Sequence, residues 1–332
     1  MANENLLEIR NLQQYFPVSK GIFKRKIGDV KAVDDVTLDI RKGETLGIVG
    51  ESGCGKTTMG RCVVRLNKPT GGNIYVRNEN GEMQDISKLS KEESLAMRKR
   101  IQIVFQDPYA SLNPSMNILS AFDEPLKLHG FGDKQQRYEI AAKMMEAVNL
   151  QPEYLYRYPH EFSGGQRQRI CIAKALALNP ELIVCDEPVS ALDVSIQAQI
   201  MNLMRKLQKE YDLTYLFIAH DLSVVKYMSD RIAVMYLGKV VELADSEEIT
   251  DSCEHPYTKA LMSAVPIPKL GAKKEEILLT GDVPSPLNPP SGCRFHPRCS
   301  SCMEICRQKE PELREIPGKP GHYCACHLMK SE

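Results

Sequence analysis

The fold is decided at Gly50-Glu51-Ser52-Gly53-Cys54-Gly55-Lys56-Thr57, which fits the pattern of a phosphate-binding loop. The glycines of this pattern let backbone amides point inward around phosphate groups. The apolar run Glu44–Val49 before the loop predicts a strand, and Lys56–Leu66 after it predicts a helix whose N-terminus adds a positive dipole end. We therefore predict a nucleoside triphosphate site that extends to Thr58. In this site Lys56 reaches the β- and γ-phosphates, and the Thr57 hydroxyl is a ligand of Mg²⁺.

A second signal lies further along the chain, where the apolar run Leu182–Cys185 ends in two acids, Asp186 and Glu187. A strand that ends in two acids is common, so the signal gains its weight from the phosphate-binding loop. With that loop in the same chain, we expect Asp186 to hold Mg²⁺ through water. Glu187 is then the residue that orients or deprotonates the attacking water beside the γ-phosphate.

Strands and helices alternate along most of the chain, which is the pattern of a doubly wound α/β fold. Helical spacing of apolar residues, as in Asp133–Leu150, predicts a helical insert between about residues 108 and 175, whose first part, Asp107–Pro125, we expect to be irregular. After residue 250 prolines become frequent, and apolar periodicity fades beyond a short helix near Tyr257–Ala264. We therefore predict one domain over residues 1–250 and a small Cys- and Pro-rich domain over residues 251–332.

Composition narrows the classes of function. The chain has 332 residues with 43 basic and 43 acidic side chains, so its formal net charge is zero, and no overall field attracts nucleic acid. Met1–Arg10 shows no secretory signal, and no stretch approaches the roughly 20 apolar residues that cross a bilayer. We expect any role at a membrane to come through a partner.

The chain contains 11 cysteines, of which six lie between Cys293 and Cys326. Without an export signal the expected compartment is the cell interior, where disulfides are disfavoured. A dense cluster there indicates metal binding first, and four thiolates suit iron–sulfur or zinc. Free, reduced thiols are the alternative.

The run Phe162-Ser163-Gly164-Gly165-Gln166 resembles the signature motif of the ATP-binding cassette (ABC) family. The resemblance implies a P-loop NTPase of the ABC cassette type that works as a pair, because in that family the motif of one subunit closes over the ATP held by another. The Ser163 hydroxyl and the amides of Gly164 and Gly165 precede a helix expected to begin near Gln166, so they suit a γ-phosphate at a helix N-terminus.

The same resemblance assigns roles to residues that by themselves are only weak evidence of a nucleotide site. Gln106, at the end of an apolar strand, corresponds to a glutamine that touches Mg²⁺ and the attacking water. His220 corresponds to a switch histidine that contacts the γ-phosphate, and Ser190–Asp193 to a loop that crosses the dimer interface. Phe16 is the residue expected to stack on adenine, although a plain surface aromatic is the alternative.

Two tail segments, His255–Leu261 and Gly292–Cys299, look like the C-terminal region of the dipeptide and oligopeptide permease ATPases. Tyr15–Val18 and the insert Lys20–Asp29 are closer to the second of the two ATPase subunits in such systems. The resemblance implies ATP hydrolysis that energises import of dipeptides or oligopeptides. A nickel-chelate importer of the same family is the alternative. The rivals from other classes are a soluble ABC protein acting on ribosomes or DNA, and an iron or redox sensor.

The resemblance also implies partners and a further cofactor. The expected partners are a second ATPase subunit, either a sister or an identical copy, two transmembrane permease subunits and, through the complex, an extracytoplasmic peptide-binding protein. The chain would then lie at the cytoplasmic face of the cell membrane and bind no nucleic acid. In some members tail cysteines bind a [4Fe–4S] cluster, and the matching positions here are Cys293, Cys299, Cys306 and Cys326, with zinc as the alternative.

Overall fold

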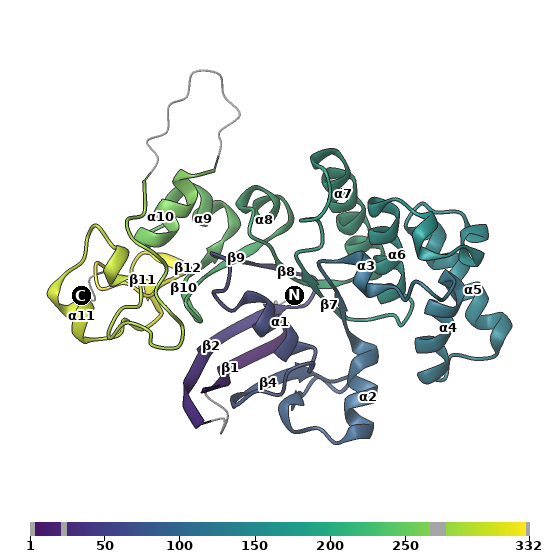
Figure 1. Ribbon diagram of the computed structural model, residues 1–332, viewed down its shortest axis with the longest axis horizontal. Helices are drawn as coiled ribbons and strands as arrows, with labels where there is room; N and C mark the ends of the chain where they lie inside the picture. Colours follow the sequence, from purple (N-terminus) through teal and green to yellow (C-terminus); the bar gives the residue numbers. More distant parts are fainter. Residues whose placement is uncertain (1–3, 21–24, 266–276, 330–332) are drawn as a thin grey trace. The chain divides into compact units, whose positions relative to one another are not determined.

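The computed structural model describes residues 4–20, 25–265 and 277–329 (Figure 1). The chain forms two compact units. The first unit comprises Met1–Leu6, Ile40–Glu44 and Val76–Ile218, and the second comprises Leu7–Asp39, Thr45–Tyr75 and Ala219–Glu332. Within the described ranges, no helix combines the length and the apolar character needed to cross a membrane.

The first unit is built on three parallel strands, β6 (Ile101–Val104), β7 (Leu182–Asp186) and β8 (Thr214–Ile218). The central strand β7 pairs with both neighbours. Every residue of β7 and β8 is buried, as expected for parallel strands covered on both faces. Because parallel strands end at the same edge of a sheet, Gln106 and Glu187, which follow β6 and β7, come to the same edge.

Six α-helices accompany these strands in the described part of the first unit (blue through teal to green in Figure 1). They are α2 (Lys91–Arg100), α3 (Pro108–Ser111), α4 (Ile118–Leu128), α5 (Lys134–Ala147), α6 (Gly164–Leu176) and α7 (Val194–Tyr211). The remaining short elements are β5 (Met83–Asp85), η1 (Ile86–Lys88), η2 (Pro152–Tyr156) and η3 (Pro159–Glu161). Helices α3 to α6 pack on one another, so the predicted helical insert is present.

The expectation of an irregular segment over Asp107–Pro125 was wrong, because the segment contains α3 and most of α4. The Asp107 carboxylate accepts a hydrogen bond from the amide of Tyr109, and Asn117 caps α4 in the same way through Ser120. Pro108 occupies the first turn of α3, where its missing N–H costs nothing. The prolines of this segment are therefore compatible with the two helices.

The second unit contains strands from both ends of the chain. Strands β2 (Arg25–Arg41), β1 (Asn5–Lys20) and β4 (Gly71–Arg77) lie side by side in that order. In a second sheet, β3 (Thr45–Val49) pairs in parallel with β9 (Arg231–Tyr236), which pairs antiparallel with β10 (Lys239–Asp245). The described part of this unit also contains α1 (Lys56–Val63), α8 (Leu222–Met228), α9 (Ser246–Ser252) and, in the tail, α10 (Pro256–Ser263).

The tail continues the second sheet. After η4 (His296–Arg298) and α11 (Glu304–Gln308) come β11 (Arg314–Ile316) and β12 (Lys319–Cys324). Strand β12 pairs antiparallel with β10, with Glu242 opposite Cys324, and with β11 on its other side.

The predicted boundary at residue 250 stays a prediction. Residues 21–24 of the insert Lys20–Asp29 lie outside the described residues.

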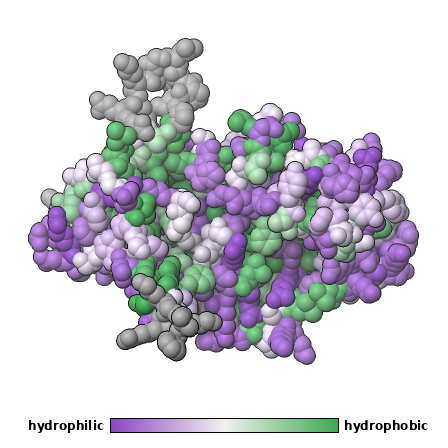
Figure 2. All heavy atoms as spheres, viewed as in Figure 1, coloured by the Kyte–Doolittle hydropathy of each residue, from purple (hydrophilic) through white to green (hydrophobic). Residues whose placement is uncertain are grey.

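Hydrophobic residues form small separate patches among hydrophilic ones on the face shown in Figure 2. The exposed aromatic side chains include three tyrosines of the helical insert, Tyr109, Tyr156 and Tyr158, which are 63%, 60% and 43% exposed.

Candidate nucleotide-binding site

The loop after the buried strand β3 takes backbone conformations that only glycine adopts readily. Gly50 has φ 150° and Gly55 has φ 107°. A Cβ atom at Gly50 would lie 2.2 Å from the carbonyl oxygen of Met235, and one at Gly55 would lie 2.0 Å from that of Ala32. Backbone oxygens cannot move aside as a flexible side chain can, so both positions require glycine.

Lys56 lies inside this loop and is only 5% exposed. Its ammonium group donates hydrogen bonds to the carbonyl oxygens of Gly50, at 2.8 Å, and Glu51, at 3.1 Å. Helix α1 begins at Lys56, and its N-cap residue, Gly55, has no side chain with which to cap it. The first amides of α1 and the Lys56 ammonium therefore converge as donors, which suits phosphate oxygens. Thr57 and Thr58 lie in the same first turn, half-buried.

Burial raises the pKa of the Cys54 thiol within the loop. Cys54 therefore stays protonated at neutral pH. It contributes no negative charge to the place where phosphates would bind.

In the first unit, Gln106 and Glu187 are in direct contact. The Gln106 amide nitrogen donates to a Glu187 carboxylate oxygen at 2.9 Å and to the Ser190 hydroxyl at 3.3 Å. The Ser190 hydroxyl in turn donates to the Glu187 carbonyl at 3.1 Å. Asp186, the last residue of β7, is buried next to this group. The structure thus brings together Gln106, Asp186 and Glu187 and adds Ser190, which was expected only as part of the interface loop Ser190–Asp193.

Glu187 has a left-handed backbone conformation, with φ 50°. This conformation is unfavourable for a residue with a Cβ, and such outliers cluster at functional sites. The Glu187 N–H donates to the carbonyl of Ile218 at 2.9 Å, which fixes the turn that follows β7. The carboxylate is thereby held at the end of the strand rather than along it.

The Ser-Gly-Gly-Gln run forms the start of α6. Ser163 is the N-cap: its hydroxyl accepts from the Gln166 amide at 3.3 Å, and the Gln166 side chain accepts from the Ser163 N–H at 3.0 Å. This capping box begins the helix at Gly164, two residues earlier than predicted.

The two glycines of this run differ. A Cβ at Gly165 would lie 2.6 Å from Ile196 of α7, whereas one at Gly164 would meet only Leu192, at an ordinary 3.5 Å. Packing within the chain therefore explains Gly165 but not Gly164. Asp193 caps α7 in a similar way to Ser163, accepting from the Ile196 amide at 3.1 Å, and is exposed.

The remaining predicted residues belong to the second unit. Phe16 on β1 is 39% exposed. The neighbouring Tyr15 is half-buried, and its hydroxyl donates a hydrogen bond to the Asp34 carboxylate, whereas Phe16 is exposed. His220 is exposed and lies directly after β8. The roles proposed for these two residues stay predictions.

Comparisons with known proteins agree with this geometry. The family model "ABC transporter" matches residues 33–190, and the model "Oligopeptide/dipeptide transporter, C-terminal region" matches residues 241–306. The oligopeptide transport ATP-binding protein AppF of Bacillus subtilis (strain 168) is 55% identical over 328 residues, which cover 98% of each chain. The dipeptide transport ATP-binding protein DppF of Haemophilus influenzae is 49% identical over 313 residues, 94% of each chain.

The chain belongs to the ATP-binding proteins of the oligopeptide and dipeptide ABC transporters. A solved structure of the ATP-binding cassette MJ0796, a dimeric post-hydrolysis state bound to ADP and Pi, is similar to this ABC ATPase, with a TM-score of 0.62 and 30% identity. The similarity covers 72% of this chain and 98% of that one. The predicted family, the ABC cassette fold and the ATPase class are thereby confirmed.

The four predicted cluster cysteines of this ABC ATPase, Cys293, Cys299, Cys306 and Cys326, line one small cavity, together with His255, His296 and His327. Nevertheless, in the described ranges no three His, Cys, Asp or Glu side chains are placed to hold a metal ion. Burial raises the pKa of Cys293 to about 11 and also raises those of Cys299 and Cys326, so these groups are protonated thiols at neutral pH. This arrangement gives no support to the predictions of an iron–sulfur cluster and of zinc, which therefore stay predictions.

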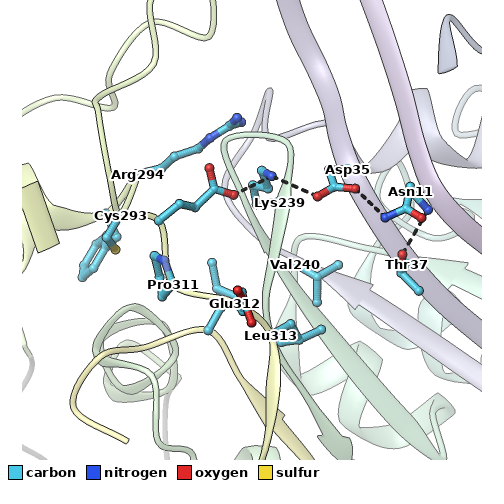
Figure 3. Close-up of a pocket in the computed structure, with 14 residues that line it drawn as sticks. Asn11, Asp35, Thr37, Lys239, Val240, Cys293, Arg294, Pro311, Glu312 and Leu313 are labelled. Atoms are coloured by element: carbon cyan, nitrogen blue, oxygen red, sulfur yellow. Dashed lines mark hydrogen bonds and ion pairs between the residues drawn. The ribbon is translucent and has the colours of Figure 1, made fainter. Parts of the chain in front are cut away.

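A different cavity, of about 430 Å³, contains only Cys293 among the predicted site residues (Figure 3). Lys239 forms ion pairs there with Glu310 at 2.5 Å and with Asp35 at 3.8 Å. Asn11 continues this chain of contacts by donating to Asp35 at 2.7 Å. None of the loop residues 50–58 lines this cavity, so it is separate from the phosphate-binding loop.

Proposed function

We propose that this ABC ATPase binds Mg²⁺-ATP at the loop Gly50–Thr58 and hydrolyses it to drive import of dipeptides or oligopeptides. The observation that carries the hydrolytic part is the 2.9 Å contact of Gln106 with a Glu187 carboxylate held in a strained turn at the end of β7. The peptide part is supported by the names of the relatives, which are oligopeptide and dipeptide transport proteins.

In this mechanism the loop amides and Lys56 bind the phosphates, and Thr57, Asp186 and Gln106 are the residues to hold Mg²⁺. When bound there, Mg²⁺ would supply positive charge that offsets the negative charge of the β- and γ-phosphates. Glu187 orients the attacking water and accepts its proton, and the Gln106 amide fixes the rotamer of that carboxylate. His220 contacts the γ-phosphate, and Phe16 stacks on adenine.

The signature supports action as a pair. Gly164 has room for a side chain within its own chain, so its glycine is explained by close approach of something outside it. Ser163 and Asp193 are exposed, and Val194 beside Asp193 is 81% exposed. We assign this surface to the nucleotide of a second ATPase subunit, either a sister chain or an identical copy, and to that subunit's loop equivalent to Ser190–Asp193.

The exposed tyrosines of the helical insert support a further partner. Arg167 stacks on Tyr109 at 3.7 Å and donates to the carbonyl of Pro159 at 2.6 Å, next to Tyr158. Exposed aromatic side chains on a rigid support are typical of protein interfaces. We assign them to two transmembrane permease subunits, which place the chain at the cytoplasmic face of the membrane and link it to an extracytoplasmic peptide-binding protein.

The test is co-expression with candidate permease subunits, followed by reconstitution into vesicles and measurement of ATP-dependent uptake. Uptake of a labelled dipeptide or oligopeptide supports the proposal. Uptake of a nickel chelate alone would replace the peptide by the alternative substrate. ATPase activity that never associates with a membrane partner would favour the soluble, non-transport class.

A [4Fe–4S] cluster at the tail cysteines remains a separate hypothesis, supported only by the four thiols that share one cavity. Purification without oxygen, with iron, sulfide and zinc measured per chain, tests it. A brown protein with about four irons per chain supports the cluster, stoichiometric zinc supports the alternative, and a colourless chain free of both metals rejects the hypothesis.

A further inference from the structure

The second residue of the phosphate-binding loop, Glu51, is held by the tail. The Arg298 guanidinium donates to both oxygens of the Glu51 carboxylate, at 2.7 and 3.1 Å. The side chain of Arg298 is only 7% exposed and that of Glu51 25%. A two-point contact of this kind, shielded from water, fixes the orientation of both groups as well as their separation.

A second tail residue holds the backbone of the same loop position. The hydroxyl of Tyr257, which is completely buried, accepts a hydrogen bond from the Glu51 N–H at 2.9 Å. The Tyr257 ring packs against Tyr236 and Phe295, with ring centroids 4.7 and 5.4 Å away. The hydroxyl is therefore held in place by three rings packed together.

All polar groups of Glu51 are thus engaged. Its N–H is bound by Tyr257, its carboxylate by Arg298, and its carbonyl by the Lys56 ammonium and, at 3.3 Å, by the Cys54 N–H. Of these contacts, those to Lys56 and Cys54 lie within the loop, and those to Tyr257 and Arg298 come from more than 200 residues away. The loop motif alone predicts neither of the distant contacts.

Because Glu51 carries a negative charge, its contacts with Arg298 and Tyr257 affect the binding of ATP. A carboxylate one residue from Gly50 stands beside the place where a triphosphate binds, and an unpaired negative charge there repels it. We propose that Arg298 and Tyr257 are positioning residues for ATP: they fix the loop through Glu51, and Arg298 neutralises the Glu51 carboxylate. This inference rests on the nucleotide site assigned under the proposed function.

The first experiment compares the KM for Mg²⁺-ATP and kcat of R298Q, R298K and the double variant E51Q/R298Q with those of the wild type. R298Q leaves the Glu51 carboxylate unpaired, so we expect the KM to rise roughly tenfold while kcat changes little. R298K keeps the positive charge but loses the two-point contact, so its KM should lie between those of the wild type and R298Q. In E51Q/R298Q the repelling charge is gone, and the KM returns toward the wild-type value. The matched control is R314Q, which removes an exposed tail arginine paired with Glu312 and leaves the KM unchanged.

The rescue separates this proposal from a merely structural role. If Arg298 only supports the fold, the double variant is as impaired as R298Q or worse, and that result overturns the proposal, as does a KM unaffected in R298Q. Thermal unfolding of each variant shows whether the chain is folded.

The second experiment does not depend on hydrolysis. Y257F removes only the hydroxyl that binds the Glu51 N–H, so hydrogen exchange in peptides spanning residues 50–56 becomes several-fold faster than in the wild type without nucleotide. Unchanged exchange in Y257F would overturn the part assigned to Tyr257. If the wild-type chain does not hydrolyse ATP, the proposed function fails, whereas this exchange result still decides whether the tail holds the loop.

Discussion

The two compact units hold their functional groups in different ways. In the second unit, Gly50 and Lys56 are buried, and each polar group of Glu51 has a partner within the unit. In the first unit, Gln106, Ser163 and Asp193 are exposed, and Gln106 meets Glu187 through one amide nitrogen shared with Ser190. The difference indicates that the loop is shaped before ATP arrives, whereas the groups of the first unit are left open to meet water and a partner. Changes to the exposed groups of the first unit should therefore affect turnover, whereas changes around the loop of the second unit should affect the affinity for ATP or the stability of the chain.

The largest expected effect is that of Glu187→Gln. The amide keeps the size and the contact with Gln106 but cannot accept a proton, so ATP hydrolysis should fall by ~100-fold or more. Binding of a fluorescent ATP analogue and the thermal unfolding midpoint should stay near the wild-type values. The matched control is Glu210→Gln, on the exposed side of α7. Retained hydrolysis would remove Glu187 from this role, and lost stability would break the contrast between the units.

The glycines at the start of α6 give a matched pair. Gly164→Ala adds a methyl group that the chain itself accommodates, so stability should be kept while ATPase activity and ATP-dependent dimerisation fall roughly tenfold. Gly165→Ala places the methyl group against Ile196 and should lower the free energy of unfolding by about 1–3 kcal/mol. For both variants, chemical unfolding measures stability, ATPase assays measure activity, and analytical ultracentrifugation with ATP measures dimerisation. Normal activity in Gly164→Ala would show that nothing approaches this face closely.

Contiguous motifs carried most of what the sequence could predict. The loop needs glycine at positions 50 and 55 for local reasons, namely positive φ and nearby backbone, so its pattern is visible in eight residues. Gln106 was predicted by resemblance and Glu187 from a strand that ends in two acids, but their 2.9 Å contact was not predicted. By contrast, Arg298 has no pattern around it that points to Glu51, because the two residues are 247 positions apart and only folding brings them together. The cysteine cluster stays a prediction, since the spacing suggests ligands but the described residues show no group of three placed to hold a metal ion.

The contrast also predicts how the second unit responds to acid. Burial lowers the pKa of His255 to about 4, even though the Glu242 carboxylate opposes this and Lys259 adds to it. The unfolded chain takes up a proton on this residue below about pH 6.5, but the folded chain does so only near pH 4. The contribution of His255 to the free energy of unfolding is therefore fully present above pH 6.5. It is lost as the pH falls toward 4, by up to ~1.4 kcal/mol per pH unit.

Urea unfolding of the wild type and of His255→Asn at pH 7.5 and 5.0 measures this loss. Asparagine keeps an acceptor for the Tyr257 N–H, which His255 Nδ1 binds at 3.1 Å, but does not titrate. The variant should lose less stability on acidification than the wild type. Equal losses in the two proteins would show that His255 does not carry this pH dependence.

The smallest expected effect tests how loosely the groups of the first unit are held. Ser190→Ala removes a hydroxyl that accepts from the Gln106 amide and donates to the Glu187 carbonyl, and leaves the Gln106 contact with Glu187 in place. Because one neutral hydrogen bond contributes about 1 kcal/mol, we expect kcat to fall by roughly threefold to fivefold, with the KM for ATP unchanged. Steady-state kinetics at saturating Mg²⁺-ATP measures it. A fall as large as that of Glu187→Gln would place Ser190 among the groups that act on the water, and a change in KM rather than kcat would mean that the first unit, like the second, shapes the binding of ATP.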